Sequence, residues 1–415
     1  MGENRADPGA VEMNLSNWLS FGSGSVEIFL AGVFGFVGLV ALLYSIARIK
    51  GLPRQQAEYY IFLLVLIAAG IALVFARELL VIFVLWELAT ISLWRLVSYF
   101  RNQEAVDAGL WALYINFAAA AVMLVGLVII QLELGSWSLG ELQGQELPMF
   151  PALLVLAGIV AKSAALPLYI WLPRAYRSAP ASVCALLSGL AENMGLVLFF
   201  KLFVQTVKVQ EQFYLISAVL AVGSALIAGG VALTVRTVRD TLAYSTVSQL
   251  GFILLALSVR GDYGITSALL YILAHAVAKS GLFLAAGAIE DAAGTGELEQ
   301  LGGWSRVSPA LAGATGVLML SIMGLPPTLG FFAKLGVVLA AVRSNLLYGI
   351  GALEAAMFTM LYMSRFYARI FLGGDGSKPI KISRMAIGLV IVMAVVSIAA
   401  GIFWFVPVRF FEGGW

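Results

Sequence analysis

Residues 161–173 read AKSAALPLYIWLP, an apolar run that contains Lys162 and is interrupted by two prolines. Proline lacks a backbone N–H group and breaks a helix. Within hydrocarbon such a break survives only where protein or an aqueous cavity satisfies the freed backbone groups, so it marks a site. Residues 324–334, GLPPTLGFFAK, repeat the pattern with Lys334. Broken helices at corresponding places in two halves indicate a transporter built from inverted repeats, and the alternative is a pair of ordinary proline kinks.

The rest of the chain predicts an all-α, polytopic membrane protein. Its 415 residues are 61% apolar and only 12% charged, against roughly a quarter charged in an ordinary soluble domain. Apolar runs of about twenty residues, the length that crosses a bilayer as a helix, recur from Val26 almost to the C-terminus. They predict about twelve transmembrane helices, near residues 27–49, 58–76, 79–98, 108–130, 151–174, 180–204, 213–234, 241–258, 263–288, 310–341, 346–370 and 384–406.

The two proline-interrupted helices divide the chain into two expected repeats. We expect two inverted five-helix repeats over residues 58–204 and 213–370, each with one proline-broken helix. An N-terminal helix and loop, 26–57, precede them, and a C-terminal helix and tail, 384–415, follow. Residues 1–25 are polar and lack the cationic start and apolar core of a signal peptide, so they predict an N-terminal tail.

Loop charges predict the orientation in the membrane. Short basic loops stay in the cytoplasm, so both termini should face outward from a multi-pass protein of the inner (cytoplasmic) membrane. The basic set comprises Arg48, Lys50, Arg54, Arg101, Arg174, Arg177, Arg236, Arg239, Arg306, Arg365, Arg369, Lys378, Lys381 and Arg384. The opposite loops carry fewer cations, chiefly Lys201, Lys208, Arg260 and Arg343.

Composition also excludes several classes of function. Cys184 is the only cysteine and His275 the only histidine, which excludes bis-histidine haem, cysteine-ligated iron–sulfur clusters and the usual zinc sites within this chain. We therefore expect no cofactor here. A net charge of +2 gives no electrostatic case for nucleic acid. Neither a phosphate-binding loop nor a hydrolytic triad is present, so the chain itself should not be a catalyst.

Ionisable residues inside the apolar runs are the candidate ion pathway. A charge isolated at the bilayer centre costs about 2.5–3.5 kcal/mol, so each one needs a reason. These residues are Glu87, Lys162, Glu192, His275, Lys279, Lys334 and Glu354. A lone buried histidine is usually structural, but Lys279 lies one helical turn from His275 and favours a proton relay. Glu87 could instead form a structural ion pair, and Glu354 could serve either purpose.

Five stretches together resemble one family of membrane proteins. They are residues 83–88 (FVLWEL), 161–180 with its lysine and prolines, 242–251 (LAYSTVSQLG), 274–283 (AHAVAKSGLF) and 324–334. Their order and spacing, from about residue 58 to 370, resemble the antiporter-like subunits of respiratory complex I, Mrp-type cation/proton antiporters and energy-converting membrane hydrogenases.

This resemblance implies roles for individual residues. Glu87 matches the family's membrane glutamate, Lys162 its partner on the first broken helix, and Lys334 the terminal lysine on the second. His275 and Lys279 match the central region.

Two departures from the family pattern matter. Asn193 stands where the family commonly has a second lysine, so Glu192 beside it or ordered water would have to substitute. The family usually has fourteen helices, and this chain is expected to lack the first two, which preserves the topology.

The expected mechanism starts from Glu87 facing Lys162. Separating a buried ion pair costs about 3–5 kcal/mol, and burial disfavours a charged lysine, so an abandoned Lys162 would release its proton toward Lys334. The leading hypothesis is an H⁺- or Na⁺-translocating, non-catalytic subunit of an oxidoreductase complex. Its partners would be other membrane subunits and peripheral iron–sulfur subunits. The alternatives are a subunit of a Mrp-type antiporter and a structural membrane anchor whose pump residues have partly decayed.

Overall fold

The computed structural model describes residues 22, 24–49, 51–374 and 382–411, and the elements within these ranges are all helices. Ten helices are long and apolar enough to cross a membrane. They are α2 (Ser25–Arg48), α3 (Pro53–Phe75), α4 (Leu79–Val97), α5 (Gln103–Leu134), the continuous run Ala181–Thr206, α10 (Glu211–Ala232), α11 (Val238–Val259), α12 (Gly261–Ala293), α16 (Leu346–Phe371) and α17 (Arg384–Ile402). Two further crossings are each split into shorter helices, so the predicted all-α membrane fold is confirmed. Most of the predicted tail, residues 1–25, lies outside the described residues.

The first broken crossing consists of α6 (Met149–Lys162), the short turn η1 (Leu168–Ile170) and α7 (Trp171–Ser178). Neighbouring protein groups satisfy the backbone freed by the break. The indole N–H of Trp171 donates to the carbonyl of Ala161 at 3.0 Å, and the N–H of Leu166 donates to the hydroxyl of Ser224 at 2.9 Å. The break is therefore hydrogen-bonded within the bundle, as an irregular backbone in a membrane must be.

The second broken crossing consists of α14 (Pro309–Met323) and α15 (Leu329–Ser344). Helix α14 ends at Gly324, whose φ of +79° is the left-handed conformation that glycine adopts without strain. The ammonium group of Lys334 returns from α15 and donates to the carbonyl of Ile322 at 2.6 Å. A cation at a helix C-terminus is stabilised by the unpaired carbonyls there. The short helix α13 (Trp304–Val307) precedes α14, and the short helix α18 (Phe405–Phe411) follows α17.

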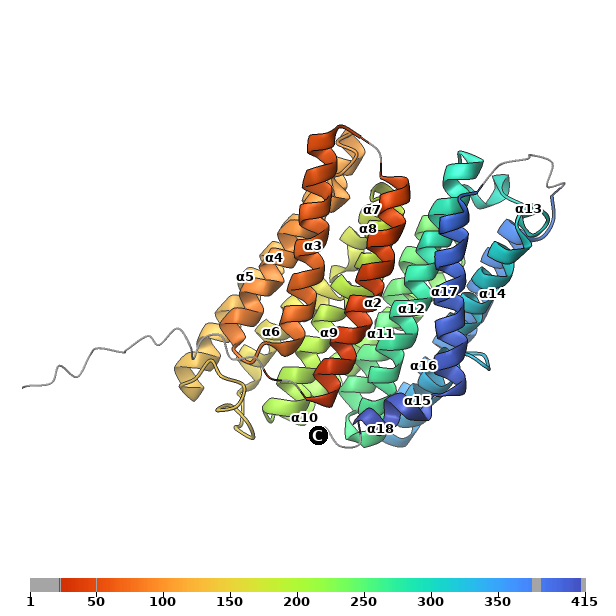
Figure 1. Ribbon diagram of the computed structural model, residues 1–415. Helices are drawn as coiled ribbons and strands as arrows, with labels where there is room; N and C mark the ends of the chain where they lie inside the picture. Colours follow the sequence, from red (N-terminus) through yellow and green to blue (C-terminus); the bar gives the residue numbers. More distant parts are fainter. Residues whose placement is uncertain (1–21, 23, 50, 375–381, 412–415) are drawn as a thin grey trace, which may run out of the picture.

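Three crossings form the centre of the bundle. The run Ala181–Thr206, together with α11 and α12, is almost wholly buried, whereas the outer helices bury less than half of their apolar windows. Helix α12 contacts α2 and α8 (Ala181–Leu186) on one side and α14, α15 and α17 on the other. In Figure 1 it stands between the first-half helices and the C-terminal ones. Side chains on these central crossings are thus shielded from lipid.

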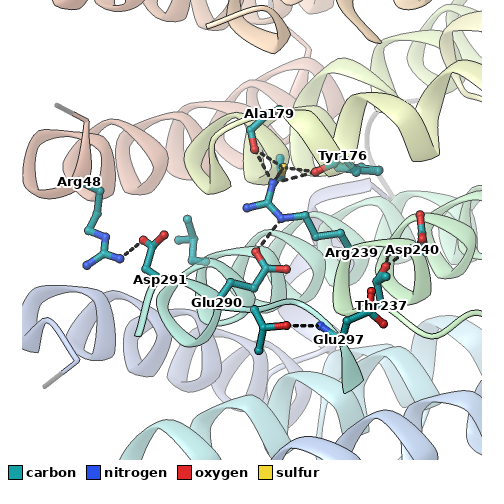
Figure 2. A network of polar contacts seen from close by, with 12 residues as sticks. Arg48, Tyr176, Ala179, Thr237, Arg239, Asp240, Glu290, Asp291 and Glu297 are labelled. Atoms are coloured by element: carbon teal, nitrogen blue, oxygen red, sulfur yellow. Dashed lines mark hydrogen bonds and ion pairs between the residues drawn. The ribbon is translucent and has the colours of Figure 1, made fainter. Parts of the chain in front are cut away.

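Arginines gather with acids at one end of the bundle. Arg239 on α11 pairs with Glu290 on α12 at 2.7 Å, and it also donates to the carbonyls of Tyr176 and Ala179 at 2.8 and 2.5 Å (Figure 2). Arg48 pairs with an acid on α12 at the same end. The predicted basic residues Lys50, Lys378 and Lys381 lie outside the described residues. This network ties the end of the first broken crossing to the second half.

The expectation that Lys201 lies in a loop is wrong. It lies in η3 (Phe200–Thr206), the last turns of a central crossing, and is only 6% exposed. Its ammonium group donates to the carbonyls of Val74 and Ala76 at 2.6 and 2.5 Å. These carbonyls end α3 and lack partners within their own helix. A lysine at the edge of an apolar run suggests an interface, but here it caps a buried helix end.

Gly330 sets the contact between the two halves of the second broken crossing. A Cβ added to Gly330 would overlap the backbone carbonyl of Ser321 in α14. Gly313, on the exposed face of α14, has no atom near the equivalent position.

We expect Gly330→Ala to lower the midpoint of thermal unfolding in detergent, because overpacking against fixed backbone costs about 1–3 kcal/mol. Gly313→Ala is the matched control and should leave the midpoint unchanged or raise it slightly, since alanine favours helix. Equal midpoints for the two variants would contradict this account of the α14–α15 contact.

Candidate functional site

Lys162 is the last residue of α6, and its side chain contacts α4. Its ammonium group donates to the hydroxyl of Thr90 at 2.6 Å and lies 3.4 Å from the carbonyl of Trp86. It also lies 4.9 Å from the centroid of the Trp86 ring, within the range of a cation–π contact. All of these partners are neutral and all belong to α4. A buried cation, 1% exposed, is therefore held by dipoles rather than by a carboxylate.

Glu87 lies between these two partners in α4 but does not join them. Both of its carboxylate oxygens are buried and accept no hydrogen bond from a described residue. Among the described residues it forms no ion pair within 4.0 Å, although it interacts electrostatically with Lys162. The expected direct contact of Glu87 with Lys162 is therefore not made. The ammonium group of Lys162 contacts Thr90 and the carbonyl of Trp86 instead.

Glu192 and Asn193 lie where a central crossing is locally widened. Helix α8 continues as the π-helix η2 (Leu187–Ala191), and α9 (Asn193–Phe199) follows. Glu192 is fully buried and accepts a hydrogen bond from the hydroxyl of Tyr176 at 2.7 Å, while its second oxygen has no described partner. Asn193 donates to the carbonyl of Ser188 at 3.0 Å, and its own side-chain oxygen is unpartnered. π-Helical turns recur at functional sites, and unsatisfied buried acceptors are where water or a proton donor binds.

His275 and Lys279 lie on α12, opposite this widened crossing. Lys279 is fully buried and donates to the carbonyl of Leu242 in α11 at 2.7 Å. It interacts electrostatically with Glu192. Neither ring nitrogen of His275 has a partner among the described residues, and the ring interacts electrostatically with Lys279 and Lys334. Both ring nitrogens can therefore bind water, and the one without a hydrogen can accept a proton.

Lys334 lies beside two aromatic rings. It is the last, in chain order, of the buried ionisable side chains that we call the buried line, namely Lys162, Glu192, His275, Lys279 and Lys334. Its ammonium nitrogen lies 4.7 Å from the ring centroid of Phe252 and 5.8 Å from that of Tyr271. The hydroxyl of Tyr271 donates to the side chain of Gln249, which in turn donates to the hydroxyl of Tyr362 at 2.9 Å. A hydrogen-bonded network thus runs from Tyr271, whose ring lies near Lys334, through Gln249 to Tyr362 in α16.

Sequence reasoning missed Tyr176, Gln249 and Tyr271. Gln249 lies within the stretch 242–251, but a neutral amide gives no charge signal in the sequence. The predicted candidate Glu354 is placed elsewhere, since it is exposed on the outer face of α16. The structure does not bring it together with the buried line.

Two broken helices that flank a buried set of ionisable side chains define a class, the polytopic ion-translocating membrane proteins. The family model described as "NADH:quinone oxidoreductase/Mrp antiporter, TM" matches residues 76–371. The chain belongs to this family, and the resemblance seen in the sequence is confirmed.

Individual relatives agree with this assignment. NADH-quinone oxidoreductase subunit N of Heliobacterium modesticaldum is 28% identical over 91% of this chain and 82% of its own length. A Na(+)/H(+) antiporter subunit of Alkalihalophilus pseudofirmus is 27% identical over 88% of this chain and 77% of its own length. A chain in the structure of the Mrp complex from Dietzia sp. DQ12-45-1b has the same fold, with a TM-score of 0.87 at 23% identity, over 95% of this chain and 85% of that one.

Thr90→Val should destabilise the contact between α4 and α6. It removes the hydroxyl that accepts from Lys162, and a hydrogen bond to a charged group contributes about 1.5–3 kcal/mol. We expect a lower midpoint of thermal unfolding and slower ion transport. Thr90→Ser keeps the hydroxyl and is the matched control; if valine and serine behaved alike, Thr90 would not be the group that holds Lys162.

Glu354→Gln should leave ion transport within about twofold of wild type, because its carboxylate is outside the buried line. Glu87→Gln, the same change at a residue whose carboxylate oxygens are buried, should reduce transport far more. Transport by the two variants is compared in vesicles with equal amounts of assembled complex. A large loss of ion transport in Glu354→Gln would contradict this placement and show that Glu354 takes part in the pathway.

Proposed function

We propose that this chain is the ion-translocating subunit of a multi-subunit membrane complex and that it moves protons. The observation that carries the proposal is the buried line Lys162, Glu192, Lys279, His275 and Lys334, each at most 4% exposed. Such groups are retained inside a membrane at a cost of several kcal/mol, which favours function over chance. The names of relatives, one a subunit of a NADH-quinone oxidoreductase and another a subunit of a Na(+)/H(+) antiporter, support the same role.

Lys162 has two alternative positions for its charge. In one it donates to Thr90 at 2.6 Å, and in the other it would turn to the unpartnered carboxylate of Glu87 on the same helix. Two opposite charges 4 Å apart attract by about 4 kcal/mol at an effective dielectric constant of 20. An exchange between the two positions therefore changes how readily Lys162 holds its proton.

Glu192 takes the role of the lysine that the family commonly has at the position of Asn193. An amide cannot carry a proton, whereas the adjacent carboxylate has one free oxygen and an electrostatic interaction with Lys279. From there the line continues through His275 to Lys334. Lysine and histidine carry protons but are poor ligands for a cation such as Na⁺, so we assign H⁺ to this part of the route.

Energy should come from partner subunits. With one cysteine and one histidine, this chain offers no ligands for an electron carrier, so we place iron–sulfur clusters in peripheral subunits of a redox-driven complex. We also place the arginine-rich end in the cytoplasm and both termini outside. The second candidate, a Mrp-type antiporter driven by an ion gradient, is favoured by the Na(+)/H(+) antiporter relative and by the fold shared with the Mrp complex.

Lys162→Ala and Lys334→Ala should each lower proton transport by roughly tenfold or more, the equivalent of about 1.4 kcal/mol of barrier. The complex is purified, reconstituted into liposomes and followed with a pH-sensitive dye, with the exposed loop variant Lys208→Ala as the control. Undiminished transport by fully assembled variants would favour the structural anchor instead. Copurification with iron–sulfur subunits supports the redox-driven complex, and copurification with antiporter subunits alone supports the Mrp type.

A further inference from the structure

Two adjacent cavities open on the outer face of α5, beside the first broken crossing. One, of about 390 Å³, is polar and lies between the start of α5 and α7; the other, of about 650 Å³, is mostly apolar and runs along α5 beside α6 and η1. Both are lined by Asp107 and Trp111, so they form one groove with a polar head and an apolar tail. We call it the α5 groove.

The polar head of the α5 groove contains a cation without a protein counter-ion. The guanidinium group of Arg174 lies 4.4 Å from the ring centroid of Trp111 and forms neither an ion pair nor a hydrogen bond with a described residue. Its neighbour Arg177 is different, because it pairs with Asp240 at 2.7 Å. Arg174 therefore presents free N–H donors in the geometry that binds a phosphate through two oxygens.

The same head also contains two acidic residues that form no salt bridge with a described residue. Glu104 and Asp107 line it, and neither forms an ion pair with a described residue; Asp107 accepts only the side-chain amide of Gln103, at 2.9 Å. One free guanidinium and two free carboxylates in a single cavity complement a ligand that has both a phosphate and an ammonium group. A purely anionic headgroup would meet the carboxylates as like charges.

The apolar tail has the depth of one membrane leaflet. Its lining on α5 extends from Asp107 to Val122, about fifteen helical steps of 1.5 Å or roughly 22 Å. One leaflet contributes about 15 Å of hydrocarbon, and the headgroup layer adds the remainder. Trp111 and Tyr114 are 41% and 63% exposed near the head, where amphipathic aromatic rings mark the interface.

We propose that the α5 groove binds a phospholipid with a primary ammonium headgroup. Its phosphate lies on Arg174, its ammonium group between Glu104 and Asp107, and one acyl chain in the tail. Leu168 in η1 and Ala157 in α6 form the opposite wall of the tail. The bound lipid therefore bridges α5 to both sides of the break that follows Lys162 and holds α7 in place.

The test uses the purified membrane complex in detergent and three lipids with identical dioleoyl chains, the phosphatidylethanolamine, phosphatidylcholine and phosphatidylglycerol. We expect phosphatidylethanolamine to raise the midpoint of thermal unfolding by roughly 3 °C or more, and the other two to raise it by less. Arg174→Gln should abolish the difference. Arg306→Gln, an exposed arginine at the same end that pairs with no described residue, is the control and should keep it.

A second variant separates binding from folding. Ala118→Trp fills the tail without touching the charged head and should also abolish the phosphatidylethanolamine effect, whereas Val219→Trp, on the exposed face of α10, should not. Equal stabilisation by all three lipids, or an unchanged response in both groove variants, would overturn the proposal. So would a cross-link from Tyr114→Cys to another subunit, since a partner helix would then occupy the groove.

Discussion

Hydrocarbon offers no hydrogen-bond partner, so each polar group in this bundle depends on another protein group. That constraint explains the position of the buried lysines. Lys201 and Lys334 each donate to the terminal carbonyls of another helix, α3 and α14, which would otherwise be unpaired. Lys162 instead uses the hydroxyl of Thr90 in the middle of α4. Two of the four buried lysines thus complete helix ends, and Lys279 donates to the carbonyl of Leu242 within α11. Lys162 has the unpartnered carboxylate of Glu87 on the helix to which it bonds.

Buried side-chain atoms without a described partner occur in several parts of the interior, for example at Asn116 and Thr315, and some of them belong to the candidate route. Glu87, Glu192, Asn193 and His275 all carry buried side-chain atoms without a described partner, and all four belong to the candidate route. Most buried polar atoms in proteins are paired, so exceptions of this kind need an explanation. For these four residues the proposed function supplies an explanation, a route whose groups accept different partners at different moments. Groups permanently satisfied by the bundle, such as Ser163 and Thr246, have no such freedom.

Much of the architecture follows from the sequence because a membrane makes hydropathy a strong signal. The twelve crossings, both breaks and the burial of Lys162, Lys279 and Lys334 were predictable. The directions in which individual side chains point were not predictable. A helical position does not say which way a side chain points, so the sequence leaves the role of Glu354 open and does not show that Thr90, rather than Glu87, binds Lys162. Neutral partners such as Tyr176 and Gln249 give no charge signal and appear only when the helices are packed together.

The arginine network at the bundle rim has a mechanical consequence. Arg239 donates a hydrogen bond to the backbone carbonyl of Tyr176 and forms an ion pair with Glu290 at the end of α12 (Figure 2). The hydroxyl of the same tyrosine holds Glu192 deep in the core. Tyr176 is therefore hydrogen-bonded at both ends, to Arg239 at the rim and to Glu192 in the interior. A neighbouring protein that pushed on the end of α12 would shift the hydrogen bond to Glu192 without touching it.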